Sequence, residues 1–284
     1  MTAPRIDSLG PDDLDDAAAL STAVDWNQTR GDWARLLDLH PDGAFGAFVD
    51  GRLAATATIA TYPPSAAWIG MVIVHPDLRG RRLGSAVMDA VLATDAASEA
   101  DAVGLDATDL GMPLYERRGF VPVARVDRWT GELRAPEAAH AVRAHEVDAD
   151  AADDLAAWDR ARAGVDRGRL LRRLLGEAGV RAWRAERDGA TVGYGVLRPG
   201  RTRAQLGPLV TDDDGALGAL LRAAASWTGD APVFVDAVRR DASRAAFEAA
   251  GLHVARRLTR MTRFEAVPLL AGEPFRAAVG LEWG

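Results

Sequence analysis

Three segments of the 284-residue chain recur in the same order in its second half. The stretch "DGRLAATATI" corresponds to "DGATVGYGVL", and "IGMVIVHPDLRGRRLGSAVM" corresponds to "LGPLVTDDDGALGALL". Further on, "LDATDLGMPLYERRGFVPVARVDRW" corresponds to "VDAVRRDASRAAFEAAGLHVARRLTRM". Within this last pair, Arg128 follows Gly119 by nine residues, and Arg260 follows Gly251 by nine. The abundance of alanine and arginine accounts for part of the agreement, but three matches in one order indicate an internal duplication.

The hydrophobic pattern predicts the order α-α-β-β-β-α-β-α-β for the first half. Residues 11–23 and 29–39 have helical spacing, and an Asp50-Gly51 turn separates two strand-like segments. The continuous apolar segment 66–74 is typical of a central strand that is buried on both faces. The sequence therefore predicts an α/β protein with a first domain at 1–132, a linker at 133–149 and a second domain at 150–284.

Composition excludes several classes of chemistry. The absence of cysteine rules out disulfides, thiolate nucleophiles and cysteine-based zinc sites. All 34 basic residues are arginine, which rules out a lysine-containing P-loop and Schiff-base catalysis. The five histidines do not reach metal-ligand spacing; His140 and His145 lie five apart in the linker. A net charge of -7 disfavours nucleic acid as a partner.

The N-terminal residues are acidic and lack the apolar core of a signal peptide. The longest strongly apolar stretch, "WIGMVIV", is too short to cross a bilayer. We therefore expect a cytoplasmic protein without a membrane partner.

The stretch "HPDLRGRRLGSAVM", residues 75–88, follows the apolar strand and continues as a helix. The start of a helix presents unpaired N–H groups and partial positive charge, which together favour an anion. Gly80 and Gly84 allow the backbone to approach a ligand, and Arg79, Arg81 and Arg82 supply charge for phosphate oxygens. The alternative is a solvated basic turn at the beginning of a helix.

The segments "VHPDLRGRRLGSAVM" and "LDATDLGMPLYERRGF" together resemble the acyl-CoA-binding region of the GNAT superfamily of N-acetyltransferases. That superfamily carries an (R/Q)-x-x-G-x-(G/A) loop after its fourth strand, and the loop amides hold the CoA pyrophosphate. Arg79 fills the first position and Gly84 the last, while Arg82 stands where the first glycine is usual. The resemblance implies two domains, each with a mixed, mostly antiparallel central sheet flanked by helices. It implies the following cofactor-binding residues: Val72, Ile73, Val74, Arg79, Gly80, Arg81, Arg82, Leu83, Gly84 and Ser85.

The resemblance also implies a mechanism in which an amine attacks the thioester of acetyl-CoA directly. The strand at 72–74 would pair with the pantetheine amides, and the amide of Val72 or its neighbour would stabilise the oxyanion. Tyr115 matches the tyrosine that often protonates the leaving thiolate. Packing of this ring beside Phe120 is the alternative.

The general base is left open, because the segment 66–74 lacks the carboxylate that the family usually carries on its fourth strand. The candidates are His75, Asp106 and a water molecule held by Asn27. His75 equally fits a plain turn residue before a proline, and Asp106 equally fits a residue that caps the next turn.

The loop "DWNQ", residues 25–28, lies where superfamily members build the acceptor side of the cleft. Some GNAT proteins with an extra acetyltransferase-like domain carry a similar Trp-Asn pair, which points to Trp26 and Asn27 as acceptor-binding residues. Core packing of Trp26 is the alternative.

The second half has a phenylalanine, Phe247, in the position of Tyr115, and "TDDDGALGA" replaces the arginine-rich loop with three aspartates. We therefore expect a degenerate second domain that does not bind the cofactor. The predicted function is transfer of acetyl from acetyl-CoA to a primary amine of a small molecule or peptide, without a metal, by a monomer or homodimer. The alternative is a non-catalytic acyl-CoA-binding sensor.

Overall fold

The computed structural model describes residues 4–136, 141–264, 270 and 272–284. Residues 137–140 of the predicted linker, including His140, lie outside the described residues. The first half comprises β1 (Arg5–Ser8), α1 (Leu14–Ala23), α2 (Arg30–Leu39), β2 (Ala44–Val49), β3 (Arg52–Tyr62), β4 (Ala66–Val74), α3 (Leu83–Leu92), α4 (Asp95–Ser98), β5 (Ala102–Ala107), α5 (Met112–Glu116) and β6 (Val121–Glu132). The second comprises β7 (Arg143–Val147), α6 (Ala152–Ala163), α7 (Gly168–Leu175), β8 (Arg181–Arg187), β9 (Ala190–Arg198), β10 (Ala204–Thr211), α8 (Asp214–Thr228), β11 (Pro232–Val238), α9 (Asp241–Ala249), β12 (His253–Phe264) and β13 (Phe275–Ala277).

The two halves repeat one succession of elements. The series β1-α1-α2-β2-β3-β4-α3-β5-α5-β6 corresponds in order to β7-α6-α7-β8-β9-β10-α8-β11-α9-β12. This confirms the predicted tandem α/β organisation. The sequence pattern does not predict the first strand of each half. The reason is visible in β1, a short, mostly exposed edge strand that has little hydrophobic periodicity.

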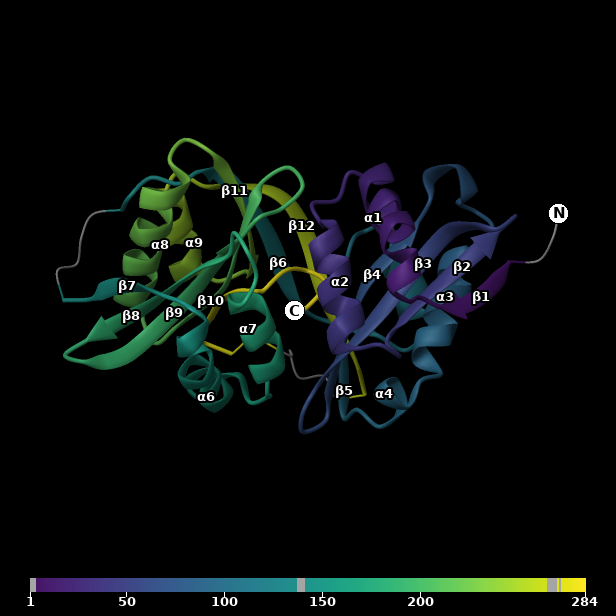
Figure 1. Cartoon of the computed structure of the whole chain (residues 1–284), viewed down its shortest axis with the longest axis horizontal. Helices are drawn as coiled ribbons and strands as arrows, with labels where there is room; N and C mark the ends of the chain where they lie inside the picture. The colour runs from purple at the N-terminus through teal and green to yellow at the C-terminus, as the bar shows by residue number, and fades with distance from the viewer. Residues whose placement is uncertain (1–3, 137–140, 265–269, 271) are drawn as a thin grey trace.

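The last strands of the two halves are exchanged. Across the described ranges, thirteen strands form one sheet in the order β1-β2-β3-β4-β5-β12-β6-β11-β10-β9-β8-β7, with β13 beside β10. β12 pairs with β5 of the first half, β6 pairs with β11 of the second, and β6 and β12 pair with each other in the centre (Figure 1). The predicted boundaries at 132 and 150 therefore describe a repeat along the chain, and the two halves do not form separate sheets.

A buried ion pair holds each exchanged strand. On β12, Arg260 donates through Nε and Nη2 to both carboxylate oxygens of Asp106 on β5, at 2.9 Å each. On β6, Arg128 donates in the same way to Asp236 on β11, at 2.7 and 2.8 Å. The nine-residue spacing seen in the sequence thus places two arginines at equivalent positions of the exchanged strands. Because a buried charge without its partner is costly, these pairs favour this register.

β4 and β5 run parallel but pair only at their beginnings, where residues 66–68 face residues 102–104. Beyond this point the two strands diverge, and the edge of β4 facing β5 loses its partner. β10 and β11 of the second half diverge in the same way after residues 204–205. There the gap is filled, because β13 pairs with β10 in antiparallel fashion. The C-terminal segment therefore occupies the second divergence and leaves the first one open.

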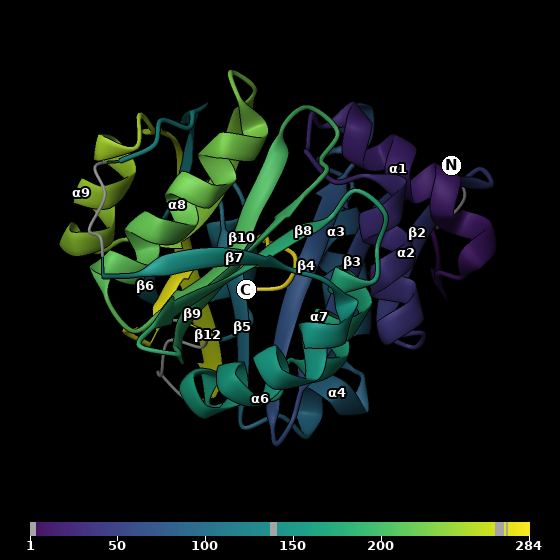
Figure 2. The ribbon, with the colours of Figure 1, turned by 60° about the vertical axis from the view of Figure 1, so that its left-hand side comes forward.

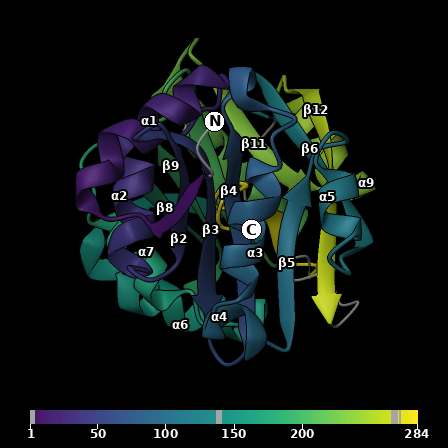
Figure 3. The same ribbon diagram turned by 90° about the vertical axis from the view of Figure 1, so that its right-hand side faces the viewer.

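Helices cover both faces of the sheet. A hydrophobic cluster on one face includes α1, α2, α6, α7 and the C-terminal Trp283, so it joins the two halves. On the other face, α3 packs across β2, β3 and β4 (Figure 3), and α8 packs over β7 to β10 (Figure 2). No helix in the described part of the chain is both long and apolar enough to span a bilayer.

Candidate active site

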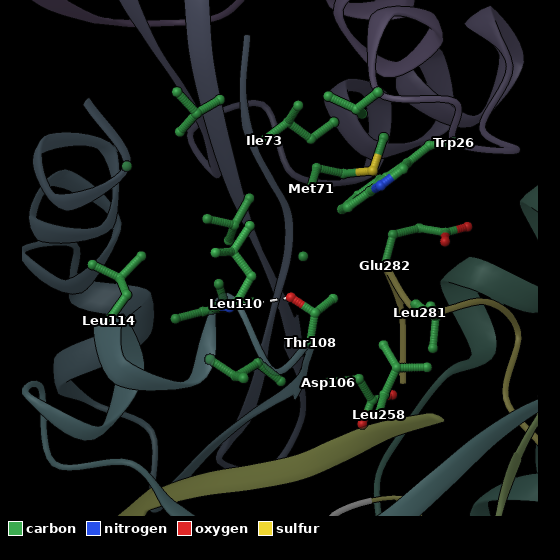
Figure 4. Close-up of a pocket in the computed structure, with 18 of the residues that line it drawn as sticks. Trp26, Met71, Ile73, Asp106, Thr108, Leu110, Leu114, Leu258, Leu281 and Glu282 are labelled. Atoms are coloured by element: carbon green, nitrogen blue, oxygen red, sulfur yellow. Dashed lines mark hydrogen bonds between the residues drawn. The ribbon is translucent and has the colours of Figure 1, made fainter. Parts of the chain in front are cut away.

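A cavity of about 340 Å³ lies where β4 and β5 diverge. One wall comes from the first half and comprises β4, the start of α3 and the segment leading into α5. The facing wall contains the loop after α1, the exchanged β12 and the C-terminal tail, with the labelled residues Trp26, Leu258, Leu281 and Glu282 (Figure 4). The cavity is therefore built by both halves of the chain.

The β4 wall presents backbone to the cavity. Residues 72–74 line the cavity, and β3 pairs with this part of β4 on its other edge only. A bulge interrupts the ladder at Met71, whose φ is +48°, and Thr56 Oγ1 donates to the Met71 carbonyl at 2.8 Å. An unpaired strand edge of this kind can pair with an extended ligand that carries amides.

The start of α3 is open to a ligand. Its N-cap, Arg82, has a left-handed backbone with φ 59°, and no side chain caps the first turn. This conformation costs an L-residue about 1–2 kcal/mol, which explains why glycine is usual at this position. Gly84 lies against β4, where a Cβ atom would come within 3.2 Å of Val74 Cγ2. The uncapped N–H groups at the start of α3 therefore lie where the helix backbone comes close to β4 at the edge of the cavity.

Three arginines surround this helix start. Arg79, Arg81 and Arg82 are exposed, and none of them forms an ion pair with a carboxylate of the described residues. Arg79 also lines the cavity, as does Gly84, whereas the lining does not include the other predicted loop residues, Gly80, Arg81, Arg82, Leu83 and Ser85. The combination of free amides and uncompensated guanidinium groups favours a polyanion such as a pyrophosphate.

Tyr115 lies on α5 with its side chain 7% exposed, and it lines the cavity. Its ring also packs edge-on against Phe120, with ring centroids 6.3 Å apart. Packing against Phe120 therefore fixes the orientation of a ring that lines the cavity. Burial raises the pKa of the hydroxyl above its ordinary value, so the phenol stays protonated at neutral pH.

Of the two side chains proposed as bases, Asp106 lines the cavity. The side chain of Asp106 is fully buried, and Arg260 occupies both of its oxygens. His75 lies in the turn before α3, where its Nδ1 accepts from the backbone N–H of Asp77 at 3.4 Å. It does not line the cavity that the described residues form. The Asp106 carboxylate is therefore engaged by Arg260, and His75 lies outside the cavity lining.

The loop between α1 and α2 brings Trp26 and Gln28, but not Asn27, to the cavity lining. Trp26 lines the cavity, as expected for an acceptor-side residue. Asn27 points away from it and into the loop after β9, where its side chain donates to the Arg203 carbonyl and accepts from the N–H of Thr202. Through these hydrogen bonds, Asn27 of the first half is held to the loop after β9 in the second half. Gln28, which the sequence analysis missed, lines the cavity instead.

The C-terminal tail brings a carboxylate into this wall. The Leu281 carbonyl accepts from Trp68 Nε1 at 3.0 Å, and the Trp283 carbonyl accepts from the Tyr62 hydroxyl at 2.7 Å. Glu282, between these anchors, accepts from Arg198 at 2.6 Å and from Gln28 at 2.7 Å. The carboxylate follows no helix or strand pattern, so no periodic signal in the sequence identifies it.

The second half differs from the first at the start of its helix α8, at the residue opposite Tyr115 and at the gap beside β10. Asp213 caps α8 by accepting from the Ala216 N–H at 3.0 Å, and its carboxylate also pairs with Arg187 at 2.8 Å. Phe247, opposite Tyr115 in the repeat, is buried against Trp129. With β13 in the gap as well, the equivalent region of the described second half has a filled strand gap beside β10, a capped start of α8 and no hydroxyl at position 247.

Comparison with known proteins gives a consistent result along both halves. Residues 13–120 match a family model described as "Acetyltransferase (GNAT) family", and residues 155–273 match one described as "Acetyltransferase (GNAT) domain". The "Uncharacterized N-acetyltransferase YitH" of Bacillus subtilis is 29% identical over 177 residues, which cover 59% of each chain. The "Holothin acyltransferase" of a Pseudoalteromonas species is 24% identical over 67% of this chain and 64% of its own length. The chain thus aligns with less than two thirds of either relative.

Solved structures show the same fold. A putative acetyltransferase from Pyrococcus horikoshii superimposes with a TM-score of 0.84 at 21% identity, covering 100% of this chain and 97% of the other. A tandem GNAT protein from the clavulanic acid biosynthesis pathway gives a TM-score of 0.66 at 17% identity, covering 94% and 99%.

Proposed function

The chain is a tandem member of the GNAT acetyltransferase superfamily, and we propose that its first half transfers acetyl from acetyl-CoA to a primary amine of a small molecule or peptide. The observation that carries this proposal is the convergence of three features on one cavity. These are the unpaired edge of β4, the uncapped start of α3 with its arginines, and the buried hydroxyl of Tyr115.

In this proposal the pyrophosphate lies at the start of α3, and the pantetheine pairs with residues 72–74. The amine nitrogen attacks the thioester carbon, and the oxyanion that forms accepts from a backbone N–H at the β4 bulge. The carbon–sulfur bond then breaks, and the Tyr115 hydroxyl donates its proton to the departing thiolate. The attacking nitrogen releases one proton to solvent as the amide forms, and the Tyr115 phenolate takes one proton from solvent, so the net products are the amide and the free thiol of CoA.

A thiol-release assay with acetyl-CoA and a panel of primary amines tests the reaction. We expect at least one amine to yield free CoA and its N-acetylated product in equal amounts, since direct transfer forms one of each. Mass spectrometry of the product and a thiol reagent measure the two yields. Bound acetyl-CoA that stays intact with every amine would contradict the proposal.

We also expect one CoA to bind per chain. The second half offers a capped helix start with aspartates and a strand gap filled by β13, both of which oppose a pyrophosphate-bearing ligand. Titration calorimetry of the full chain with CoA measures the stoichiometry. A value of two sites per chain would overturn the assignment of the cofactor to the first half alone.

A further inference from the structure

Gln28 carries a buried oxygen that has no partner. The residue is 6% exposed and lines the cavity, and its Nε2 donates to Glu282 Oε2 at 2.7 Å. Because a carboxylate only accepts hydrogen bonds, the amide nitrogen must face Glu282, and this fixes the orientation of the amide. Its Oε1 is left buried without a hydrogen-bond partner among the described residues.

Such an oxygen destabilises the fold unless a ligand donates a hydrogen bond to it, since a buried carbonyl without a donor carries a cost that such a bond removes. The group that suits it is an N–H donor, and the neighbouring Glu282 carboxylate favours a donor that carries positive charge. Arg198 and Gln28 hold this carboxylate in place, so it forms a fixed feature of the wall.

Arg256 presents the opposite charge to the same cavity. It lies on the exchanged strand β12, two residues before Leu258, and both residues line the cavity. Its neighbour across the ladder, Arg128, is occupied by Asp236. Arg256 itself forms no ion pair with any carboxylate in the described ranges. Desolvation, followed by repulsion from Arg128, lowers the pKa of its guanidinium and outweighs the attraction of Asp236 and Asp109.

We propose that the acceptor is an amine that also bears an anionic group, with the amine donating to Gln28 Oε1 beside Glu282 and the anion pairing with Arg256. This inference rests on the proposed acetyl transfer and specifies its acceptor class. Gln28 and Arg256 are positioning residues, because they orient the two ends of the acceptor. The anion is recognised by its charge, so carboxylates and phosphates belong to one class here.

The anion site is tested with pairs of amines in which one member carries an anionic group and the other carries an uncharged group in its place. Amino acids are compared with their carboxamides, and phosphate-bearing amines with the matching alcohols, by kcat/KM at fixed acetyl-CoA. We expect the wild type to prefer the anionic member. Arg256→Ala should lower kcat/KM about 10- to 100-fold for that member alone, since a charge-assisted bond is worth about 1.5–3 kcal/mol. Arg257→Ala, which removes an exposed charge from the same strand outside the cavity, should keep the preference.

Gln28→Met tests the amine site, because it keeps the length of the side chain and removes both the Oε1 acceptor and the Nε2 donor to Glu282. We expect KM for the amine to rise while kcat at saturating amine and the affinity for CoA stay near wild type, and Gln28→Asn should recover part of the loss. An unchanged KM in Gln28→Met would overturn the amine site. Equal use of both members of each pair by the wild type would overturn the anion site.

Acceptor binding in the presence of CoA separates this proposal from acetyl transfer itself. Titration calorimetry with the anionic amines requires no turnover, and we expect binding that Arg256→Ala weakens. A wild type that binds these amines but never consumes acetyl-CoA would contradict the proposed function and leave the acceptor class supported. If acetyl-CoA were consumed only with amines that lack an anionic group, the acceptor class would be contradicted and the proposed function would remain supported. Thermal unfolding of each variant confirms that it is folded.

Discussion

Replacement of Tyr115 by phenylalanine should lower kcat by about 10²–10⁴-fold, the range that general acid catalysis contributes. The variant keeps the ring that packs against Phe120 and removes only the hydroxyl of this cavity-lining residue. The affinity for CoA should therefore stay near wild type. Steady-state kinetics with a productive amine and CoA calorimetry measure the two quantities.

The dependence on pH gives a second readout for Tyr115. A free phenol has a pKa of about 10, and burial raises the pKa of this one further. The acid form is therefore kept up to alkaline pH, and wild-type kcat should not fall through deprotonation of Tyr115 below pH values near 10. A Tyr115→Phe variant that retains wild-type kcat would show that the ring serves packing alone.

The double replacement Arg81→Ala with Arg82→Ala should weaken CoA binding on the order of a hundredfold. Each charge-assisted hydrogen bond to a phosphate is worth about 1.5–3 kcal/mol, and both guanidiniums are exposed beside the uncapped start of α3. Calorimetry at low salt measures the loss. The difference between variant and wild type should narrow as salt is added, because exposed charges are screened.

A matched control removes the same charge elsewhere. Arg52 and Arg143 are exposed residues on β3 and β7 that do not line the cavity, so their joint replacement by alanine should leave CoA affinity unchanged. Equal affinity for CoA in the Arg81/Arg82 variant and in the wild type would return these arginines to the role of a solvated basic turn.

Local patterns in the sequence determined the repeat, the element order and the cofactor side of the cavity. Residues 66–92 form a strand, a turn that contains glycine and arginine, and a helix, one after another. Because these elements are contiguous, their geometry depends on neighbouring residues. The duplication made the prediction stronger, because every element could be compared with its counterpart. The loss of the loop arginines and of the tyrosine hydroxyl in the second half was readable for the same reason.

The acceptor side depended on contacts between distant residues, and local patterns do not report these. Asn27 and Gln28 are adjacent polar residues, and only the loop after β9 decides which of them turns away from the cavity. Glu282 reaches the first half because the C-terminal segment passes through the gap of the second half before it. Nothing in the sequence around position 282 records that path.

The exchange of β6 and β12 shows why this limit is physical. The two strands are counterparts in the repeat, with the same length, the same burial pattern over residues 125–132 and 257–264, and an arginine at the same position. Either strand could satisfy the hydrophobic and ionic requirements of either sheet, so the sequence determined that both strands exist and that each carries a buried arginine. Only the tertiary structure decided that β12 lies beside β5, because that choice depends on pairing between residues about 150 apart in the chain. Because β12 lies beside β5, its residue Arg256 lines the cavity where β4 and β5 diverge.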